Sequence, residues 1–143
     1  MADISHAVTV PAPPERVFPW MLEVDKVPQW VDGVSSYEVV GGGEPGLGAR
    51  LRQTLTVSGF TMTAESEVVA FDPPRHAATE SETNGMRVRI EYRVEPDGDG
   101  SRVTQSIDLK PQGLKAKMIS GMVRGQMDSK LPADLERLRA LLS

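Results

Sequence analysis

Five short turn signals interrupt residues 34–109, and their spacing limits the folds that this chain can adopt. They contain glycine, proline or asparagine and separate runs of alternating apolar and polar residues, at 41–48, 58–59, 72–74, 84–85 and 96–100. The Asn-Gly pair at 84–85 is the sharpest signal, because both residues tolerate the positive φ angles of a two-residue hairpin turn. The six runs leave no room for crossover helices, so we expect six antiparallel strands.

The segment before this region predicts a seventh strand followed by two short helices. Apolar residues alternate with small or polar ones over residues 4–10, which is typical of a strand. The proline pair at 13–14 suits the first turn of a helix, whereas Pro19 and Pro28 interrupt the helical pattern that follows. We therefore expect two short helices that end near Trp30.

Residues 114–142 carry the pattern of one long helix. A rotation of about 100° per residue places Met118, Met122 and Gln126 on one face, together with Ile119 and Val123. We expect this face to meet the sheet. Pro132 removes a backbone hydrogen bond, so a kink or brief break is expected just before it, at about residues 130–132.

Composition argues against several classes of function. The chain has no cysteine and only two histidines, so we expect no disulfide, no metal site and no cofactor. A net charge of -4 argues against nucleic acid as a partner. No apolar run approaches the length of a membrane span, and the first residues lack the pattern of a signal peptide. We expect a cytoplasmic protein without stable membrane insertion, and the oligomeric state stays open.

The glycine-rich segment 41–48 admits two interpretations. Glycine loops can bind phosphate, but such loops precede a helix whose N-terminal N–H groups hold the anion. Here residues 51–57 follow with period-two alternation, which is typical of a strand. We therefore interpret the segment as a connection between two strands.

Five motifs accompany this order of elements, which extends over nearly the whole chain. They are VTVPAPPERVF at 8–18, VPQW at 27–30, the glycine segment before Ala49-Arg50-Leu51, FDPPR at 71–75 and GDGSRVT at 98–104. In these features the chain resembles the polyketide cyclase/dehydrase branch of the SRPBCC superfamily, which includes START lipid-transfer domains and the birch-pollen allergen.

This resemblance implies a single helix-grip domain of the α+β class over residues 1–143. In such a fold, a seven-stranded curved antiparallel sheet wraps around a long C-terminal helix, and two short helices follow the first strand. The resemblance also implies an apolar cavity between the sheet and the helix. The glycine segment would then join the second and third strands at the edge of that cavity.

We expect the cavity to bind one apolar or amphipathic small molecule, such as a lipid, a polyketide-like aromatic or an isoprenoid. Two alternatives stay open: a cofactor-independent cyclase or dehydratase acting on a polyketide-like substrate, and a protein-interaction module that assists chaperones. The low aromatic content of 5% and the small residues Ala64, Gly121 and Gly125 favour a cavity over a filled core. We expect a volume on the order of several hundred Å³, near residues 118–126.

The residues expected to contact the ligand lie on the apolar faces of the strands and of the long helix. Gln53, Tyr92 and Gln105 are polar members of these faces, and buried polar groups need partners, which a ligand or one another can supply. Trp30 is included because relatives place an aromatic residue beside the cavity. The full set is Trp30, Leu51, Gln53, Leu55, Phe60, Met62, Ile90, Tyr92, Gln105, Met118, Met122 and Gln126.

His6 and Tyr92 are the candidate catalytic residues if the protein is an enzyme. His6 is the only inward candidate that titrates near neutral pH, although a lone histidine on a strand often has a structural role. Alternation does not settle which face Glu80 and Glu82 take. If they point inward, burial would raise their pKa and make them acid–base candidates as well.

Overall fold

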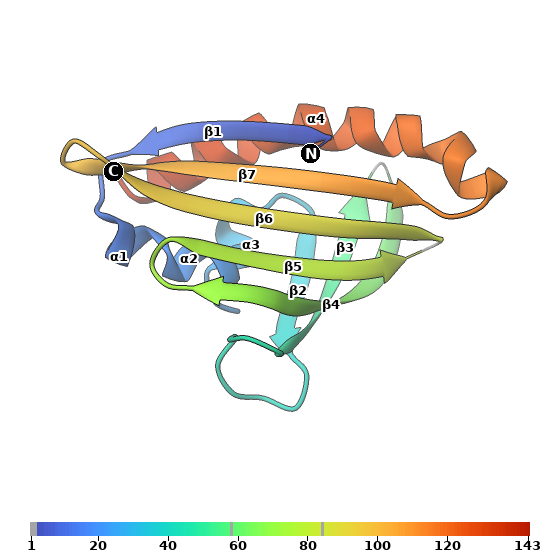
Figure 1. Ribbon diagram of the computed structural model, residues 1–143, viewed down its shortest axis with the longest axis horizontal. Helices are drawn as coiled ribbons and strands as arrows, with labels where there is room; N and C mark the ends of the chain where they lie inside the picture. The colour runs from blue at the N-terminus through green and yellow to red at the C-terminus, as the bar shows by residue number, and fades with distance from the viewer. Residues whose placement is uncertain (1–2, 58, 84) are drawn as a thin grey trace.

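The computed structural model describes residues 3–57, 59–83 and 85–143, and its elements follow the predicted order (Figure 1). Strand β1 (Ile4–Val10) precedes three short helices, α1 (Pro14–Val17), α2 (Pro19–Leu22) and α3 (Val27–Trp30). Within the described ranges, the strands that follow are β2 (Val34–Val39), β3 (Arg50–Val57), β4 (Phe60–Asp72), β5 (His76–Thr83), β6 (Met86–Asp97) and β7 (Gly100–Pro111). The 28-residue helix α4 (Leu114–Leu141) comes last.

All strands belong to one antiparallel sheet, whose order across the described residues is β1-β7-β6-β5-β4-β3-β2. Strands that are neighbours in sequence from β2 to β7 pair with one another, and β1 pairs with β7 from Ile4↔Ile107 to Val10↔Ser101. Figure 1 shows that the sheet is curved and that α4 runs alongside β1. The predicted helix-grip fold is therefore confirmed.

Three four-residue helices stand where two were predicted. Pro19 has no N–H and cannot donate to the carbonyl oxygen of Glu15, so the helical run that begins at Pro14 divides at Phe18. Pro19 and Pro28 lie in the first turn of α2 and α3, where a missing N–H costs no intrahelical hydrogen bond. The prolines thus set where each short helix begins.

Helix α4 continues without a break through Pro132, which corrects the break expected near residues 130–132. The buried stripe of Leu131, Leu135 and Leu138 therefore extends along one continuous helix toward its N-terminus. At about 100° per residue, this stripe reaches Ser120 and Ala116, which are both buried. Small residues thus occupy the sheet-facing side of the first turns of α4, and Val123 and Met127 pack against the core further along the helix.

The predicted inner face of α4 is wrong at Met118 and Met122, although Val123, which was assigned to the same face, does pack against the core. Met118 and Met122 are 77% and 61% exposed, and they lie on the side of the helix opposite Ala116 and Ser120. Gly121 and Gly125 have open space where a Cβ atom would be, so they do not make room beneath the helix. Sequence periodicity favoured the larger apolar residues, although the packed side carries the smaller ones.

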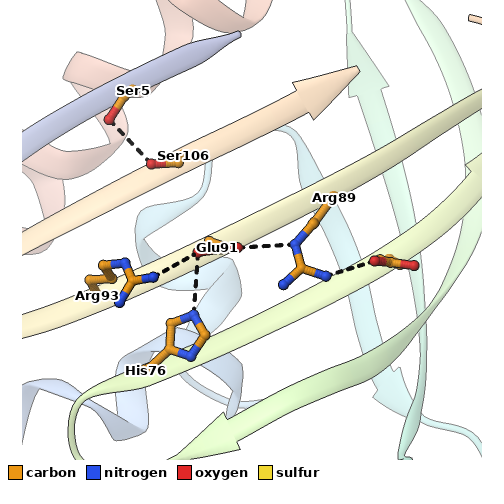
Figure 2. A network of polar contacts seen from close by, with 7 residues as sticks. Ser5, His76, Arg89, Glu91, Arg93 and Ser106 are labelled. Atoms are coloured by element: carbon orange, nitrogen blue, oxygen red, sulfur yellow. Dashed lines mark hydrogen bonds and ion pairs between the residues drawn. The ribbon is translucent and has the colours of Figure 1, made fainter. Parts of the chain in front are cut away.

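A network of charged side chains links β5 and β6 on the face of the sheet that points away from α4 (Figure 2). Glu91 Oε1 accepts a hydrogen bond from Arg89 Nε at 3.0 Å, and Glu91 Oε2 lies 3.3 Å from His76 Nε2. Arg89 Nη1 also donates to Glu80 Oε2 at 2.7 Å. Glu80 therefore points away from the helix, and it is not an acid–base candidate for the cavity. Glu82 is exposed and pairs with Arg87 at 3.6 Å on the same face.

The network predicts a pH-dependent contribution of Glu91 to stability. Burial raises the pKa of Glu91, but hydrogen bonds from Arg89 and His76 outweigh it and hold the pKa below its ordinary value. A lowered folded-state pKa stabilises the fold at pH values above the unfolded pKa of about 4.3, and this contribution is lost as the pH falls through the folded-state value. Glu91→Gln should therefore lower the free energy of unfolding by about 0.5–1 kcal/mol at neutral pH, with a much smaller loss in acid.

Urea unfolding at neutral pH and near pH 3 measures this difference. Glu82→Gln is the matched control, because its carboxylate is more exposed and forms one longer ion pair. An equal loss of stability for Glu91→Gln at both pH values would contradict the assignment.

Candidate functional site

A cavity of about 80 Å³ lies between the concave face of the sheet and the C-terminal half of α4. Its walls come from the short helices, from strands β2 to β7 and from α4. The apolar lining residues are Leu22, Val27, Val31, Leu51, Leu55, Ile90, Ile107, Met127 and Leu131. The polar lining residues are Tyr37, Gln53, Ser66, Thr79, Tyr92, Gln105, Lys130 and Asp134.

The space exists because small side chains face inward at the centre of the sheet. Ser66 of β4 pairs with Ser81 of β5, and Thr79 pairs with Val68, so short side chains line this part of the concave face. Ala64 pairs with Gln53 of β3 in the same region. A long helix crossing a curved sheet cannot fill a gap above residues of this size.

Gln105 supplies an unsatisfied acceptor in the cavity wall. Its side chain is 5% exposed, and within the described part of the chain its Oε1 atom is buried without a hydrogen-bond partner. Leaving a buried acceptor unpaired costs about 1–3 kcal/mol, and most buried polar groups in proteins do find a partner. An acceptor held in a mostly apolar cavity is therefore suited to a donor group on a ligand.

Two phenol groups lie in the same wall as neutral donors. Burial raises the pKa of Tyr92, and the nearby Asp134 carboxylate raises it further. Burial also raises the pKa of Tyr37, with a smaller contribution from Tyr92. Both hydroxyl groups stay protonated at neutral pH, so they can donate hydrogen bonds but cannot act as bases. The ring of Tyr92 is fixed by an edge-on contact with Trp30, at 6.2 Å between centroids.

A buried carboxylate closes the α4 side of the cavity. Asp134 is 2% exposed, and its oxygens pair with Lys130 and, at 3.1 Å, with Arg137 Nη1. Asp134 Oδ1 also accepts a hydrogen bond from the backbone N–H of Asp32 at 3.1 Å. Arg137 donates in turn to the carbonyl oxygen of Trp30 at 2.8 Å. The Asp134 cluster thus binds α4 to the segment that joins α3 and β2.

A surface groove adjoins the cavity at this cluster. Lys130 and Asp134 line the cavity and also line the groove, whose other walls include Thr56 of β3 and Met122, Gln126 and Ser129 of α4. The Lys130–Asp134 ion pair is therefore part of the walls of both spaces.

The structure brings half of the residues expected to contact a ligand to the cavity. They are Leu51, Gln53, Leu55, Ile90, Tyr92 and Gln105, which all come from strands β3, β6 and β7. Among the other expected residues, Trp30 is fully buried behind Tyr92, and its Nε1–H donates to the carbonyl oxygen of Trp20 at 2.8 Å. Met62 is half-buried but is not a lining residue.

The expected contacts on α4 do not line the cavity. Met118 is solvent-exposed, whereas Met122 and Gln126 line the groove outside the cavity. The side chain of Phe60, at the start of β4, lies outside the described part of the structure. The glycine segment 41–48 does join β2 and β3, but none of its residues lines the cavity.

His6 lies at the contact between β1 and α4, away from the cavity. Its Nε2 atom is 2.6 Å from Asp128 Oδ1, and the two side chains are 29% and 61% exposed. The side chain of His6 points to the inner face of the sheet, as predicted. However, β1 is an edge strand, and α4 packs directly against it. His6 is therefore not among the residues that line the cavity, where a catalytic residue would have to lie.

Sequence reasoning missed several lining residues, and the reasons differ. Tyr37 alternates with Val39 on β2, and that alternation is a signal that could have placed Tyr37 on the inner face. The inward face of β5, which carries Thr79, could not be assigned because small and polar residues occupy both of its faces. Lys130 and Asp134 are spaced as a solvent-exposed helical ion pair would be, so nothing in the sequence indicates that Asp134 is buried.

The observed volume is well below the several hundred Å³ expected. The N-terminal half of α4 turns its glycines outward, whereas Met127 and Leu131 fill space above the sheet.

Across the described residues, no group of histidine and carboxylate side chains is arranged to hold a metal ion. None of the described helices combines the length and the apolar character needed to cross a membrane.

Comparisons with known proteins agree with this architecture. Residues 1–143 match the profile of a family described as polyketide cyclase / dehydrase and lipid transport. No curated protein sequence matches the chain significantly. A crystal structure of TTHA0849 from Thermus thermophilus is similar at 20% identity, with a TM-score of 0.78 over 97% of this chain and 95% of that one.

Two other similar structures come from proteins of different kinds. Ara h 8.0201 shares 17% identity, with a TM-score of 0.69 over 97% of this chain and 95% of that one. The di-domain ARO/CYC BexL from the BE-7585A biosynthetic pathway shares 20% identity, with a TM-score of 0.76 over 98% of this chain and 46% of that one. At these identities the likeness extends to the fold alone.

The Asp134 cluster predicts a large difference between two aspartates of the same helix. Asp134→Asn should lower the free energy of unfolding by about 2–3 kcal/mol, because it removes the charge that Lys130 and Arg137 face in a buried position. Asp128→Asn is the matched control and should cost less than about 1 kcal/mol, because Asp128 is mostly exposed. Urea unfolding of both variants tests this prediction. Equal losses of unfolding free energy would show that the buried Asp134 cluster does not stabilise the fold more than an exposed ion pair does.

Proposed function

Because the chain belongs to the polyketide cyclase/dehydrase and lipid transport family, we propose that it binds an apolar or amphipathic small molecule between the sheet and α4. The observation that carries the proposal is the unpaired Gln105 Oε1 atom in a mostly apolar cavity. Lipids, polyketide-like aromatics and isoprenoids all combine a large apolar surface with a few polar groups. The apolar surface of such a ligand would contact the apolar lining residues, and one of its polar groups would pair with Gln105 Oε1.

Leu51, Leu55 and Ile90 would contact the apolar body of the ligand. A hydroxyl or other donor group would bind Gln105 Oε1, and an acceptor would bind the neutral phenol of Tyr92. Gln53 lies on the same wall and can serve either role, because its amide has both a donor and an acceptor. Trp30 supports Tyr92 from behind rather than touching the ligand.

A ligand of ordinary size needs more room than the cavity has. Small-molecule sites usually hold about 300–1,000 Å³, whereas this cavity holds about 80 Å³. The adjoining groove supplies the space if the flexible Lys130 side chain swings away from Asp134, because both residues line both spaces. Met122 and Gln126 would then lie along the entry route. Binding is therefore expected to displace Lys130.

Gln105→Leu tests this proposal through two opposite effects. Removal of a buried unpaired acceptor should leave stability unchanged or raise it by about 1 kcal/mol. The same change should weaken the binding of a ligand with a donor group by about five- to tenfold, because that donor loses its partner. Calorimetric titration with 1-decanol measures affinity, and urea unfolding measures stability.

The methyl ether of 1-decanol is the control ligand, since it has no donor, and its affinity should not depend on Gln105. Ile107→Val is the control variant, because it removes only a methylene from an apolar part of the wall. Failure of wild-type protein to bind either ligand or a wider panel of fatty acids and flavonoids would count against the function. Equal weakening for both ligands would count against the role of Gln105 only.

A cyclase or dehydratase of the same shape is the second candidate. The observation in its favour is the Tyr92 phenol, which burial keeps protonated and which faces the space where a carbonyl oxygen would lie. It could donate a hydrogen bond to that oxygen, without giving up its proton, and so stabilise the negative charge that develops there in the transition state. The similarity to the di-domain ARO/CYC BexL gives this candidate additional support.

Tyr92→Phe separates the two candidates. In an enzyme, the change should lower turnover of a poly-β-ketone analogue by about a hundredfold while affinity changes little. In a binding protein, wild type should return the analogue unchanged, and Tyr92→Phe should cost at most about tenfold in affinity. Product analysis by liquid chromatography with mass spectrometry distinguishes these outcomes.

A further inference from the structure

The N-terminal half of α4 presents large apolar side chains to solvent. Leu114, Met118 and Met122 follow one another at four-residue spacing and are 77%, 77% and 61% exposed. They lie on the side of the helix directly opposite the buried Ala116 and Ser120. Figure 1 shows the first turns of α4, in orange, extending past the start of β1. This stripe is therefore not part of the core that holds the helix in place.

Basic residues flank the stripe. Lys115 and Lys117 are exposed, and helical geometry places them on its two sides. Residues 114–127 contain these two lysines and Arg124 but no acidic residue, although the whole chain has 20 acidic and 16 basic residues. Arg124 forms an ion pair with Asp3 at 3.6 Å, so the lysines carry most of the local charge. The stripe is thus a basic and apolar surface on an acidic protein.

We propose that the outer face of α4, defined by Leu114, Lys115, Lys117, Met118 and Met122, docks on the surface of an anionic lipid bilayer. A helix that lies in the membrane interface needs apolar side chains on one side and cations at the edges of that side. Lysine stems can extend so that the ammonium groups reach lipid phosphates while the apolar residues enter the acyl region. The outer face of α4 has this arrangement.

Charge favours a bilayer over a second copy of the chain. Two outer faces packed together would bring Lys115 and Lys117 of both copies close to one another, with no acidic residue of 114–127 to compensate. An anionic membrane supplies the opposite charge along the whole stripe. Net negative charge elsewhere on the protein would also turn this face, rather than another, toward the membrane.

The outer face of α4 lies next to the groove that adjoins the cavity. Met122 belongs to the outer face and also lines the groove that adjoins the cavity. A docked helix would hold the mouth of this groove beside the lipid. The docking itself depends on surface residues alone, so it can be tested apart from the binding of any molecule in the cavity.

Vesicle co-sedimentation tests the proposal with two lipid compositions. Wild-type protein should bind vesicles of phosphatidylcholine with about a quarter phosphatidylglycerol, and should bind pure phosphatidylcholine vesicles at least about tenfold more weakly. About 0.5 M NaCl should weaken the binding to anionic vesicles, because it screens the lysines. Met118→Glu should reduce that binding by at least about tenfold.

Leu47→Glu is the matched control, because Leu47 is an apolar residue of similar exposure, 71%, that lies outside α4. It should bind anionic vesicles like wild type, and circular dichroism should show both variants folded. No binding of wild type to anionic vesicles, or equal losses for the two variants, would overturn the proposal. Sedimentation velocity that shows a wild-type dimer, lost in Met118→Glu, would assign the surface to a second copy instead.

Discussion

The buried carboxylate of Asp134 fixes the relation between the long helix and the rest of the molecule. Its partners come from α4 itself, as Lys130 and Arg137, and from the backbone of Asp32 after α3. At 2% exposure this carboxylate carries a large desolvation cost, and Arg137 and the Asp32 N–H still offset part of that cost when Lys130 moves aside. The rotation of α4 about its axis is therefore constrained at this point. That rotation decides which helix residues face the cavity and which face solvent.

The rotation of α4 determines the composition of both its inner side, toward the sheet, and its outer side, toward solvent. On the inner side, Met127 and Leu131 approach the sheet and reduce the cavity, while Lys130 and Asp134 line both the cavity and the groove. On the outer side, Met118 and Met122 stay largely exposed. The cavity wall of Gln105 and Tyr92 lies on the sheet, where cross-strand pairing between β6 and β7 sets its geometry. In the proposed binding function, the sheet provides recognition and the helix controls access.

Local patterns were sufficient to locate the strands, although not to assign the faces of β5, and they were not sufficient to orient the helix. Alternation and turn residues identified each strand, because a half-buried strand repeats every two residues, and they placed Gln53, Tyr92 and Gln105 on the concave face. The N-terminal half of α4 offers two candidate faces, one with methionines and one with Ala116 and Ser120, and periodicity alone favoured the larger residues. Neither the burial of Asp134 nor the pairing of His6 with Asp128 has a sequence signal, since both depend on contacts between distant segments.

Native mass spectrometry of the protein purified from its own host tests the central claim most directly. The account predicts a one-to-one complex with a mostly apolar small molecule that carries a hydroxyl or another hydrogen-bond donor, and a smaller bound fraction for Gln105→Leu prepared in the same way. Protein mass alone in the wild-type spectrum, or a bound molecule without any donor group, would contradict it.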